Sequence, residues 1–253
     1  MDSHAYWMAL QGGPLYGGRP NELDAFLYSP AFAQALAPLG WLPWEAFGSL
    51  WLMCNVAAVL WLLRPLPHRL AVPAGLFALP ALVVGNIYIL LAVMAVLGGR
   101  YPAVWAFGVL TKVSPGVGIV WLLARRDWRG AAIAVGVTGA LAAVSWAMAP
   151  AAWSEWLHLL GSESGSPVVY ARWAVACVLA VVSARPGRTW LLAVAVVLAS
   201  PIPIGPAAFV PLLAIPRLLD ADRDSARRLL ATARQEEALS GRTRDAVTSP
   251  LGH

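Results

Sequence analysis

The chain has 253 residues, of which 59% are hydrophobic and only 12% are charged, and its formal net charge at pH 7 is +5. Soluble domains average about half apolar and about a quarter charged residues, so this composition excludes an ordinary soluble protein. The excess positive charge lies wholly in residues 1–219, because the segment from Asp220 onward carries six arginines and six acids. In a membrane protein such an excess sets orientation and does not imply a nucleic-acid partner.

Long apolar runs recur along the chain and predict an all-α fold, a polytopic transmembrane helical bundle. We expect three segments in chain order. Residues 1–43 are turn-rich and form an extracytoplasmic loop segment, and residues 44–219 form the transmembrane domain. Residues 220–253 form a cytoplasmic tail that is partly helical or disordered.

Three runs have the length and composition of ordinary membrane spans. Residues 44–63 form the first clear span, with Trp44 and Trp61 near its two ends, as at the two membrane interfaces. Residues 130–149 and 167–184 are the other two.

Three further apolar stretches, residues 70–99, 101–124 and 189–216, are each interrupted near the middle and bounded by arginines. Gly85-Asn86, "TKVSP" and "SPIPIGP" are the interruptions. If each stretch turns back at its interruption, all the flanking arginines stay on one face, as the positive-inside rule favours. Such half-length helices reach only about 21 Å of a ~30 Å core, which is tolerated where they line a water-filled cavity. We favour hairpins over single kinked crossings.

Charge predicts the orientation. The loop "PAAWSEWLHLLGSESGSP" (150–167) has two acids and no arginine or lysine, so we place it outside with the N-terminal segment. The arginines that follow the spans, and the tail, then lie in the cytoplasm. This arrangement predicts a multi-pass protein of the plasma membrane.

The sequence gives no support for a metal or disulfide site. Cys54 and Cys177 fall inside apolar runs, where two buried small hydrophobic residues are the expected reading. The four histidines are scattered over loops and ends, without the spacing of metal ligands. We therefore expect no metal and no cofactor.

Lys112 is the only lysine in the chain and lies in the middle of an apolar run. A lysine at mid-membrane costs roughly 2.5 to 3.5 kcal/mol on insertion scales, so it normally faces a cavity or a counter-charge. One interpretation is structural: Lys112 reaches the interface or pairs with a carbonyl at the break made by Pro115. The other is that Lys112, with Asn86 and Ser114 on the outer side, binds an anionic ligand such as phosphate.

Several motifs occur in an order that resembles glycosyltransferase family 87. The run "DSHAYWMALQGGPLYG…FLYSPAFAQALAPLGWLP" resembles the family's first extracytoplasmic loop, with an opening aspartate and a later Tyr-x-Pro. "GNIYILLAVMAVLGGR", "LTKVSPGVGIVWLLARRDWRG" and "LASPIPIGPAAFVPLLAIPRLL" resemble three later segments of the family. The resemblance covers about residues 1–219.

This resemblance implies a GT-C type membrane enzyme that takes a sugar from a polyprenyl-phosphate donor. Asp2 would be the catalytic base, and Lys112 would stabilise the phosphate leaving group. Tyr28, Asn86 and Ser114 would contribute to the sugar or lipid-phosphate site. The partners would be the lipid-linked sugar, a lipid or glycan acceptor and membrane lipids, with mannose the commonest sugar and arabinofuranose the alternative.

The chain departs from the family pattern at its start. Family members have a transmembrane helix before the catalytic aspartate, whereas here Asp2 follows the first methionine. The open alternatives are a start site further upstream and a truncated relative, which would be a non-catalytic scaffold. A small-molecule transporter would also use broken helices and an intramembrane lysine. It would have no need of the acidic, aromatic first segment.

Overall fold

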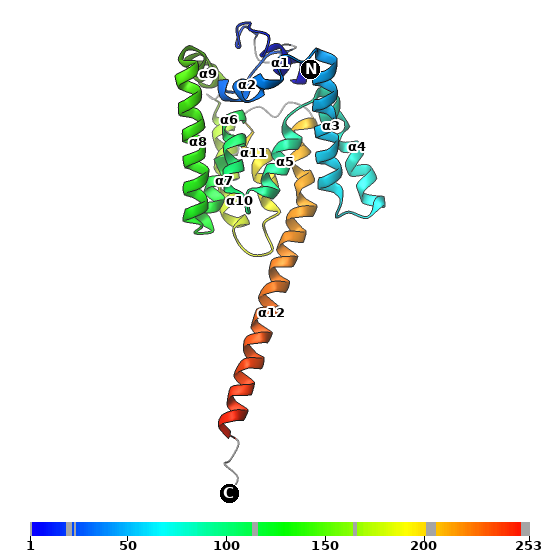
Figure 1. Cartoon of the computed structure of the whole chain (residues 1–253), viewed down its shortest axis with the longest axis vertical. Helices are drawn as coiled ribbons and strands as arrows, with labels where there is room; N and C mark the ends of the chain where they lie inside the picture. The colour runs from blue at the N-terminus through cyan, green and yellow to red at the C-terminus, as the bar shows by residue number, and fades with distance from the viewer. Residues whose placement is uncertain are drawn as a thin grey trace.

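The computed structural model describes the chain except for residues 1, 19–21, 23, 113–115, 164–165, 201–205 and 249–253, and except for the side chains of residues 162, 163, 206, 229 and 233–248. Throughout the described residues the fold is all-α (Figure 1). The helices, in chain order, are α1 (Asp2–Met8), α2 (Pro30–Leu36), η1 (Ala37–Leu39), α3 (Trp44–Leu63), α4 (His68–Val84), α5 (Tyr88–Leu97), η2 (Pro102–Val104), α6 (Trp105–Lys112), α7 (Val117–Ala124), α8 (Trp128–Met148), α9 (Pro150–Glu163), α10 (Pro167–Ser183), α11 (Leu191–Ala199), η4 (Pro206–Ala214) and α12 (Ile215–Thr248).

The ordinary spans expected from the sequence correspond to α3, α8 and α10. Of the described helices, α3 and α8 are long and apolar enough to cross a membrane, with 20 and 21 residues. α4, α5 and α10 are apolar but shorter, with 17, 10 and 17 residues.

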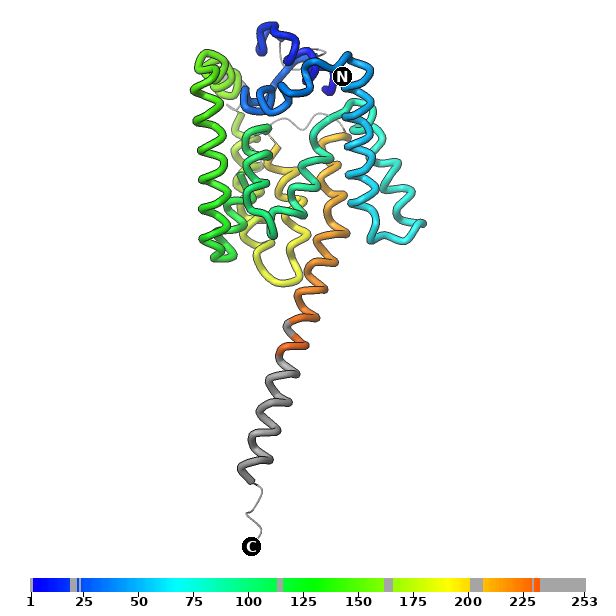
Figure 2. The backbone as a smooth tube through the Cα atoms, viewed as in Figure 1, coloured from blue at the N-terminus to red at the C-terminus, as the bar shows by residue number. Residues whose placement is uncertain are grey.

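Each of the three interrupted stretches is a hairpin of two short elements (Figures 1 and 2). The pairs are α4 with α5, α6 with α7, and α11 with η4. Tyr88 and Ser200, both next to an interruption, are hydrogen-bonded to each other at one end of the bundle. Arg100 and Arg185, which flank the same stretches, line one cavity at the other end. The chain therefore reverses direction within each stretch.

Gly85 makes the reversal between α4 and α5. Its φ of 71° lies in the left-handed region, where a residue with a Cβ is strained. A Cβ at this position would also lie 2.4 Å from the Ser3 hydroxyl oxygen, so glycine allows α1 to approach the turn. The Trp51 indole N–H donates to the Gly85 carbonyl at 2.8 Å and fixes the turn against α3.

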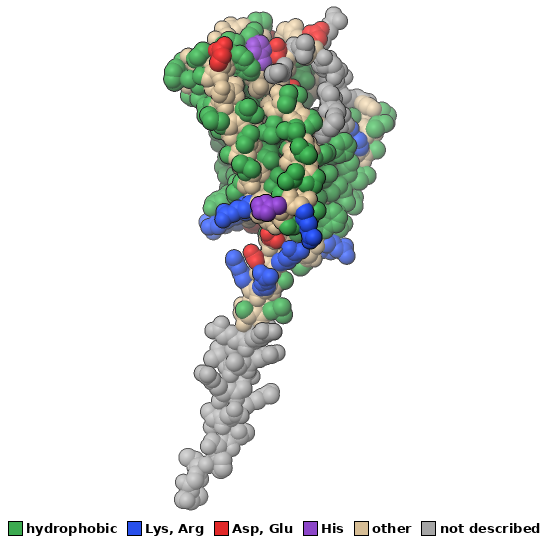
Figure 3. All heavy atoms as spheres, turned by 90° about the vertical axis from the view of Figure 1, so that its right-hand side faces the viewer, with side chains coloured by type: hydrophobic (Ala, Val, Ile, Leu, Met, Phe, Trp, Pro, Cys, Tyr) green, Lys and Arg blue, Asp and Glu red, His purple; other side chains and the backbone are tan. Residues whose placement is uncertain are grey.

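The two ends of the bundle differ in charge (Figure 3). α1, α2 and α9 cover one end, which we call the capped end; it carries Asp2, Asp24 and Glu45. The opposite end, the arginine end, carries arginines that flank α3, α4, α5, α7, α8 and α10: Arg64, Arg69, Arg100, Arg125, Arg129 and Arg185. The surface between the two ends exposes large apolar side chains, among them Leu60, Val72, Val135, Val144 and Val178.

One expectation about the cysteines is wrong. Cys177 is half-buried, but Cys54 is exposed, because α3 turns that face outward beside the exposed Met53. Both thiols are free.

α12 begins before the predicted tail, at Ile215, and continues away from the bundle (Figures 1 and 2). The Arg217 guanidinium donates to the Trp61 carbonyl at 2.6 Å and 2.9 Å, which ties its first turn to the end of α3. The Asp222 carboxylate accepts from the Thr189 N–H at 3.0 Å and from the Thr189 hydroxyl at 2.6 Å.

Candidate active site

Asp2 begins α1, and its carboxylate accepts a hydrogen bond from the Asn86 side-chain amide. Asn86 is held in turn, because its side-chain oxygen accepts from the Tyr88 N–H at 3.0 Å. The left-handed Gly85 places this asparagine at the capped end of the α4–α5 hairpin, facing α1. Asp2 and Asn86, which are 84 residues apart in the chain, are therefore neighbours in the fold.

Lys112 is the last residue of α6 and lies over an aromatic platform. Its ammonium nitrogen is 3.7 Å from the centre of the Tyr88 ring and 5.6 Å from the centre of the Tyr28 ring. The electron-rich faces of aromatic rings attract a cation, so the charge is stabilised without a carboxylate in direct contact. Lys112 is close enough to Asp2 to act electrostatically on its carboxyl.

Tyr28 is fixed by hydrogen bonds from two other tyrosines. The Tyr6 hydroxyl donates to the Tyr28 hydroxyl at 2.9 Å, and the Tyr16 hydroxyl donates to the Tyr28 carbonyl at 2.8 Å. The next residue, Ser29, donates its hydroxyl to the carbonyl of Leu110 near the end of α6. The first segment is thereby tied to the helix that carries Lys112.

The N-terminal segment owes its packing to aromatic contacts. Tyr6 makes edge-to-face contacts with Tyr28, Phe32 and Trp51, with ring centres 5.1 to 5.3 Å apart. Each such pair contributes roughly 0.5 to 1.5 kcal/mol beyond area burial. α1 has only seven residues, too few to be stable alone, so this cluster is what orders the helix that begins with Asp2.

Burial raises the pKa of the Asp2 carboxyl above its ordinary value of 3.8, although the Lys112 charge and the Asn86 hydrogen bond act in the opposite direction. Burial also raises the pKa of the Tyr28 hydroxyl to about 12, so this group stays neutral at physiological pH. The cluster thus joins one carboxyl group suited to proton exchange with one fixed cation.

Sequence reasoning missed the residues that support the platform from the far side. The Tyr88 hydroxyl shares a hydrogen bond with the Ser200 hydroxyl at 2.8 Å. The segment that carries Ser200 is held by α10: Arg172 donates to the Ser200 carbonyl, and the Trp173 indole donates to the Ala199 carbonyl at 2.8 Å. A signal existed, since Arg172 is a charged residue inside a predicted span.

The structure brings together four of the five predicted site residues, namely Asp2, Tyr28, Asn86 and Lys112. Ser114 lies outside the described residues. A neighbouring pair, His4 and Asp24, lies beside this cluster with 2.8 Å between ring nitrogen and carboxylate oxygen. The roles predicted for the clustered residues remain predictions.

The family model of glycosyltransferase family 87 matches residues 26–174, which is more than half of the chain. The chain belongs to glycosyltransferase family 87. Tyr28, Asn86, Lys112 and Arg172 fall inside the matched residues, whereas Asp2 precedes them. Neither a curated protein nor a solved structure matches the chain. Glycosyltransferases of this family are typically membrane-bound.

Proposed function

We propose that the chain is an integral membrane enzyme that moves a sugar from a polyprenyl-phosphate donor to a lipid or glycan acceptor outside the cytoplasm. The observation that carries the proposal is the cluster itself, in which a carboxylate and an ammonium lie together beneath the capped end. Sugar transfer from a phosphate needs these two groups, a base for the acceptor and a cation for the leaving group.

The proposed step is a direct displacement. The Asp2 carboxylate takes the proton of the acceptor hydroxyl as its oxygen bonds to the anomeric carbon. The bond from that carbon to the phosphate oxygen breaks, and its electron pair leaves with the polyprenyl phosphate, which gains a negative charge. The Lys112 ammonium stabilises this charge as it develops. Attack from the face opposite the phosphate inverts the anomeric carbon.

The remaining predicted residues would shape the site. Asn86 orients the base through its hydrogen bond, and Tyr28 presents a rigid, neutral hydroxyl and ring to the sugar or the lipid phosphate. Ser114 would add a hydroxyl beside Lys112. Mannose is the first sugar to test and arabinofuranose the second, a choice that rests on the family resemblance.

A multi-pass arrangement in the plasma membrane is supported by the apolar surface between the two charged ends. An exposed apolar belt this extensive is rare on soluble monomers and is expected where lipid covers it. With the arginine end in the cytoplasm, as the positive-inside rule favours, the capped end and the cluster face outward. The C-terminal ends of α4, α6 and α11 then lie on the side of the proposed chemistry.

Reconstituted transfer tests the proposal. The full chain in liposomes is given radiolabelled polyprenyl-phosphate mannose and a lipid acceptor extract, and labelled product is counted. Asp2→Asn and Lys112→Ala should each abolish transfer while membrane insertion is kept. Glu45→Gln is the matched control, because this exposed carboxylate lies at the same end but outside the cluster. Undiminished turnover in Lys112→Ala would remove Lys112 from the site.

The alternatives from other protein classes predict different results in the same liposomes. A transporter would move labelled substrate across the bilayer without forming a new glycosidic bond. A non-catalytic scaffold would give neither result with either sugar donor.

A further inference from the structure

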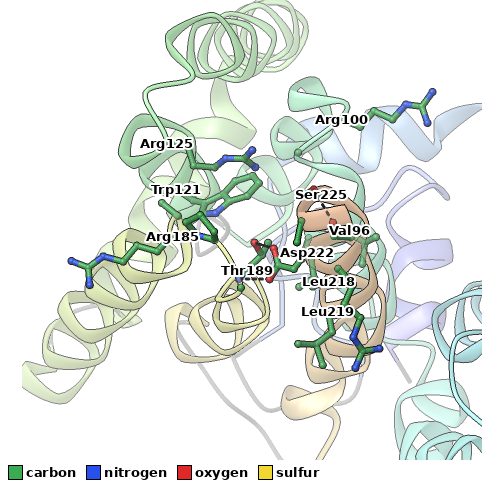
Figure 4. A pocket seen from close by; sticks show the side chains of 18 of the residues that line it. Val96, Arg100, Trp121, Arg125, Arg185, Thr189, Leu218, Leu219, Asp222 and Ser225 are labelled. Atoms are coloured by element: carbon green, nitrogen blue, oxygen red, sulfur yellow. Dashed lines mark hydrogen bonds between the residues drawn. The ribbon is translucent and has the colours of Figure 1, made fainter. Parts of the chain in front are cut away.

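A second site lies at the opposite end of the bundle from the cluster. A cavity of about 1120 Å³ lies between the ends of α5 and α7, the connection from α10 to α11, and residues 218–228 of α12 (Figure 4). Five arginines line it, against one acid: Arg100, Arg125, Arg185, Arg223 and Arg228, with Asp222. The proposed sugar transfer uses none of these residues.

The acid does not neutralise the arginines. Both carboxylate oxygens of Asp222 accept hydrogen bonds from Thr189, which fastens α12 to the connection between α10 and α11. Arg223 pairs with Asp220 at 3.2 Å. Among the described residues, no carboxylate lies within ion-pair distance of Arg100, Arg125 or Arg185.

The positive charge exceeds the opposing charge of the helix ends. α5, α7 and α10 end here, and each C-terminus carries a partial negative charge of about half a unit. With the Arg223–Asp220 pair set aside, the other four arginines of the lining oppose Asp222 and these three helix ends, which together carry about two and a half negative charges. The cavity therefore keeps a net attraction for anions.

Arg125 is the arginine that an aromatic contact holds at the cavity. Figure 4 shows Arg125 lying against Trp121, while the side chains of Arg100 and Arg185 extend away from the cavity on opposite sides. The Arg125 guanidinium carbon is 4.6 Å from the centre of the indole ring, whose electron-rich face attracts this charge. One arginine side chain can bind two phosphate oxygens at once, because its N–H donors form a planar fork.

The inner wall of the cavity is apolar. Ala95, Val96, Ala184 and Leu218 line it below the arginines. Val181 near the end of α10 and Leu123 near the end of α7 are also exposed, a few residues before Arg185 and Arg125 in the chain. A ligand that fits both parts has a phosphate at one end and hydrocarbon at the other.

We propose that this cavity binds the phosphate headgroup of an anionic phospholipid from the leaflet at the arginine end. Arg125 contacts the phosphate, and Arg100 and Arg185 turn inward from either side to contact it too. The acyl chains lie along the apolar wall and the belt. The site would seat α12 against the bundle, since Asp222, Ser225 and Ala226 of α12 form one side of it. It is independent of sugar transfer and stands whether or not the cluster is catalytic.

Native mass spectrometry of the full chain, released from nanodiscs of mixed zwitterionic and anionic phospholipid, tests the site. The wild type should retain anionic lipid. The triple variant Arg100→Gln, Arg125→Gln and Arg185→Gln should bind it about fivefold less for each arginine, or about a hundredfold less in total. The matched control is Arg64→Gln, Arg69→Gln and Arg129→Gln, which removes the same charge from the same end away from the cavity.

Three further outcomes bear on the proposal. Equal loss of lipid in both triple variants would overturn it, because that result indicates general attraction of the arginine end. Displacement of the lipid by soluble pyrophosphate would also overturn the assignment to a lipid, in favour of a soluble phosphate ligand. If the cavity triple does not fold, Ala226→Trp replaces it: this exposed α12 position lines the cavity, so added bulk should expel the lipid with all arginines kept. Full lipid retention in Ala226→Trp would count against the site.

Discussion

Asp2 and Lys112 are held near each other by two different kinds of contact. The carboxylate is held by a directional hydrogen bond from Asn86, whereas the ammonium is held by the faces of two tyrosine rings. A ring platform leaves the N–H donors on the remaining side of the ammonium available to a phosphate, which a salt bridge to Asp2 would not. The separation of supports keeps the base and the cation from neutralising each other.

The raised pKa of Asp2 gives the reaction a pH dependence. A base acts only when deprotonated, so transfer should fall as the pH drops through a pKa above 3.8. In Asn86→Ala the carboxylate loses a hydrogen bond that lowers its pKa, so the fall should begin at higher pH. The measurement is the rate of sugar transfer against pH in liposomes.

Gln11→Ala is the control for this shift, because Gln11 is an exposed amide at the same end that bonds to the Gly40 carbonyl at 3.2 Å instead of to Asp2. Its profile should match the wild type. An unchanged acid limb in Asn86→Ala, or a move to lower pH, would separate Asn86 from the base.

Polar residues inside apolar runs are the ones that the sequence makes visible. Lys112 and Asn86 were predicted as site residues because nothing in a lipid-facing helix explains them. Tyr88 and Ser200 were missed because tyrosine and serine are common in apolar helices, and only the fold shows the 2.8 Å bond between them. The two residues are 112 positions apart and belong to different hairpins, so no local sequence pattern predicts their contact.

Among the elements, the α4–α5 hairpin contributes most to the site, and it depends on one glycine. Gly85→Ala would place a side chain in the left-handed region, at a cost of roughly 1 to 2 kcal/mol. The new Cβ would also displace Ser3, and with it the Asp2 carboxylate. A displacement of about 1 Å can reduce turnover by about a hundredfold. We therefore expect Gly85→Ala to lower both the unfolding temperature and the transfer rate.

Thermal unfolding in detergent and transfer in liposomes would measure the two effects. Gly139→Ala is the control, since a Cβ there meets nothing within 4 Å and α8 gains a better helix former. Adding Ser3→Gly to Gly85→Ala removes the clash but not the backbone strain, so it should restore activity more than stability. Normal activity in Gly85→Ala alone would show that the turn does not position Asp2.

Element positions could be read from the sequence where apolar runs meet glycine and proline. α3 occupies the predicted residues 44–63, and the two described elements of each hairpin lie on either side of the interruption. The short helices α1 and α2 were not expected, because seven residues each carry too weak a local signal. Their order comes from aromatic packing against α3 and α6, which depends on the finished fold.

At the scale of the whole molecule, the opposite charges of the two ends make a prediction about topology. Arginine is retained on the cytoplasmic side during insertion, so α9 should lie outside the cell and the start of α12 inside. Single cysteines at Ser162 and Ser225, in a chain whose Cys54 and Cys177 are replaced by alanine, report on these two positions.

A membrane-impermeant maleimide should label the cysteine at position 162 in intact cells, and the one at position 225 only after the membrane is permeabilised. The two positions serve as controls for each other, because each must react once both sides are accessible. The opposite pattern would place the Asp2–Lys112 cluster in the cytoplasm and the arginine cavity outside. The proposed orientation assigns the lipid-linked sugar donor to the outer side and the anionic phospholipid to the cytoplasmic leaflet. A reversed orientation would therefore contradict both assignments.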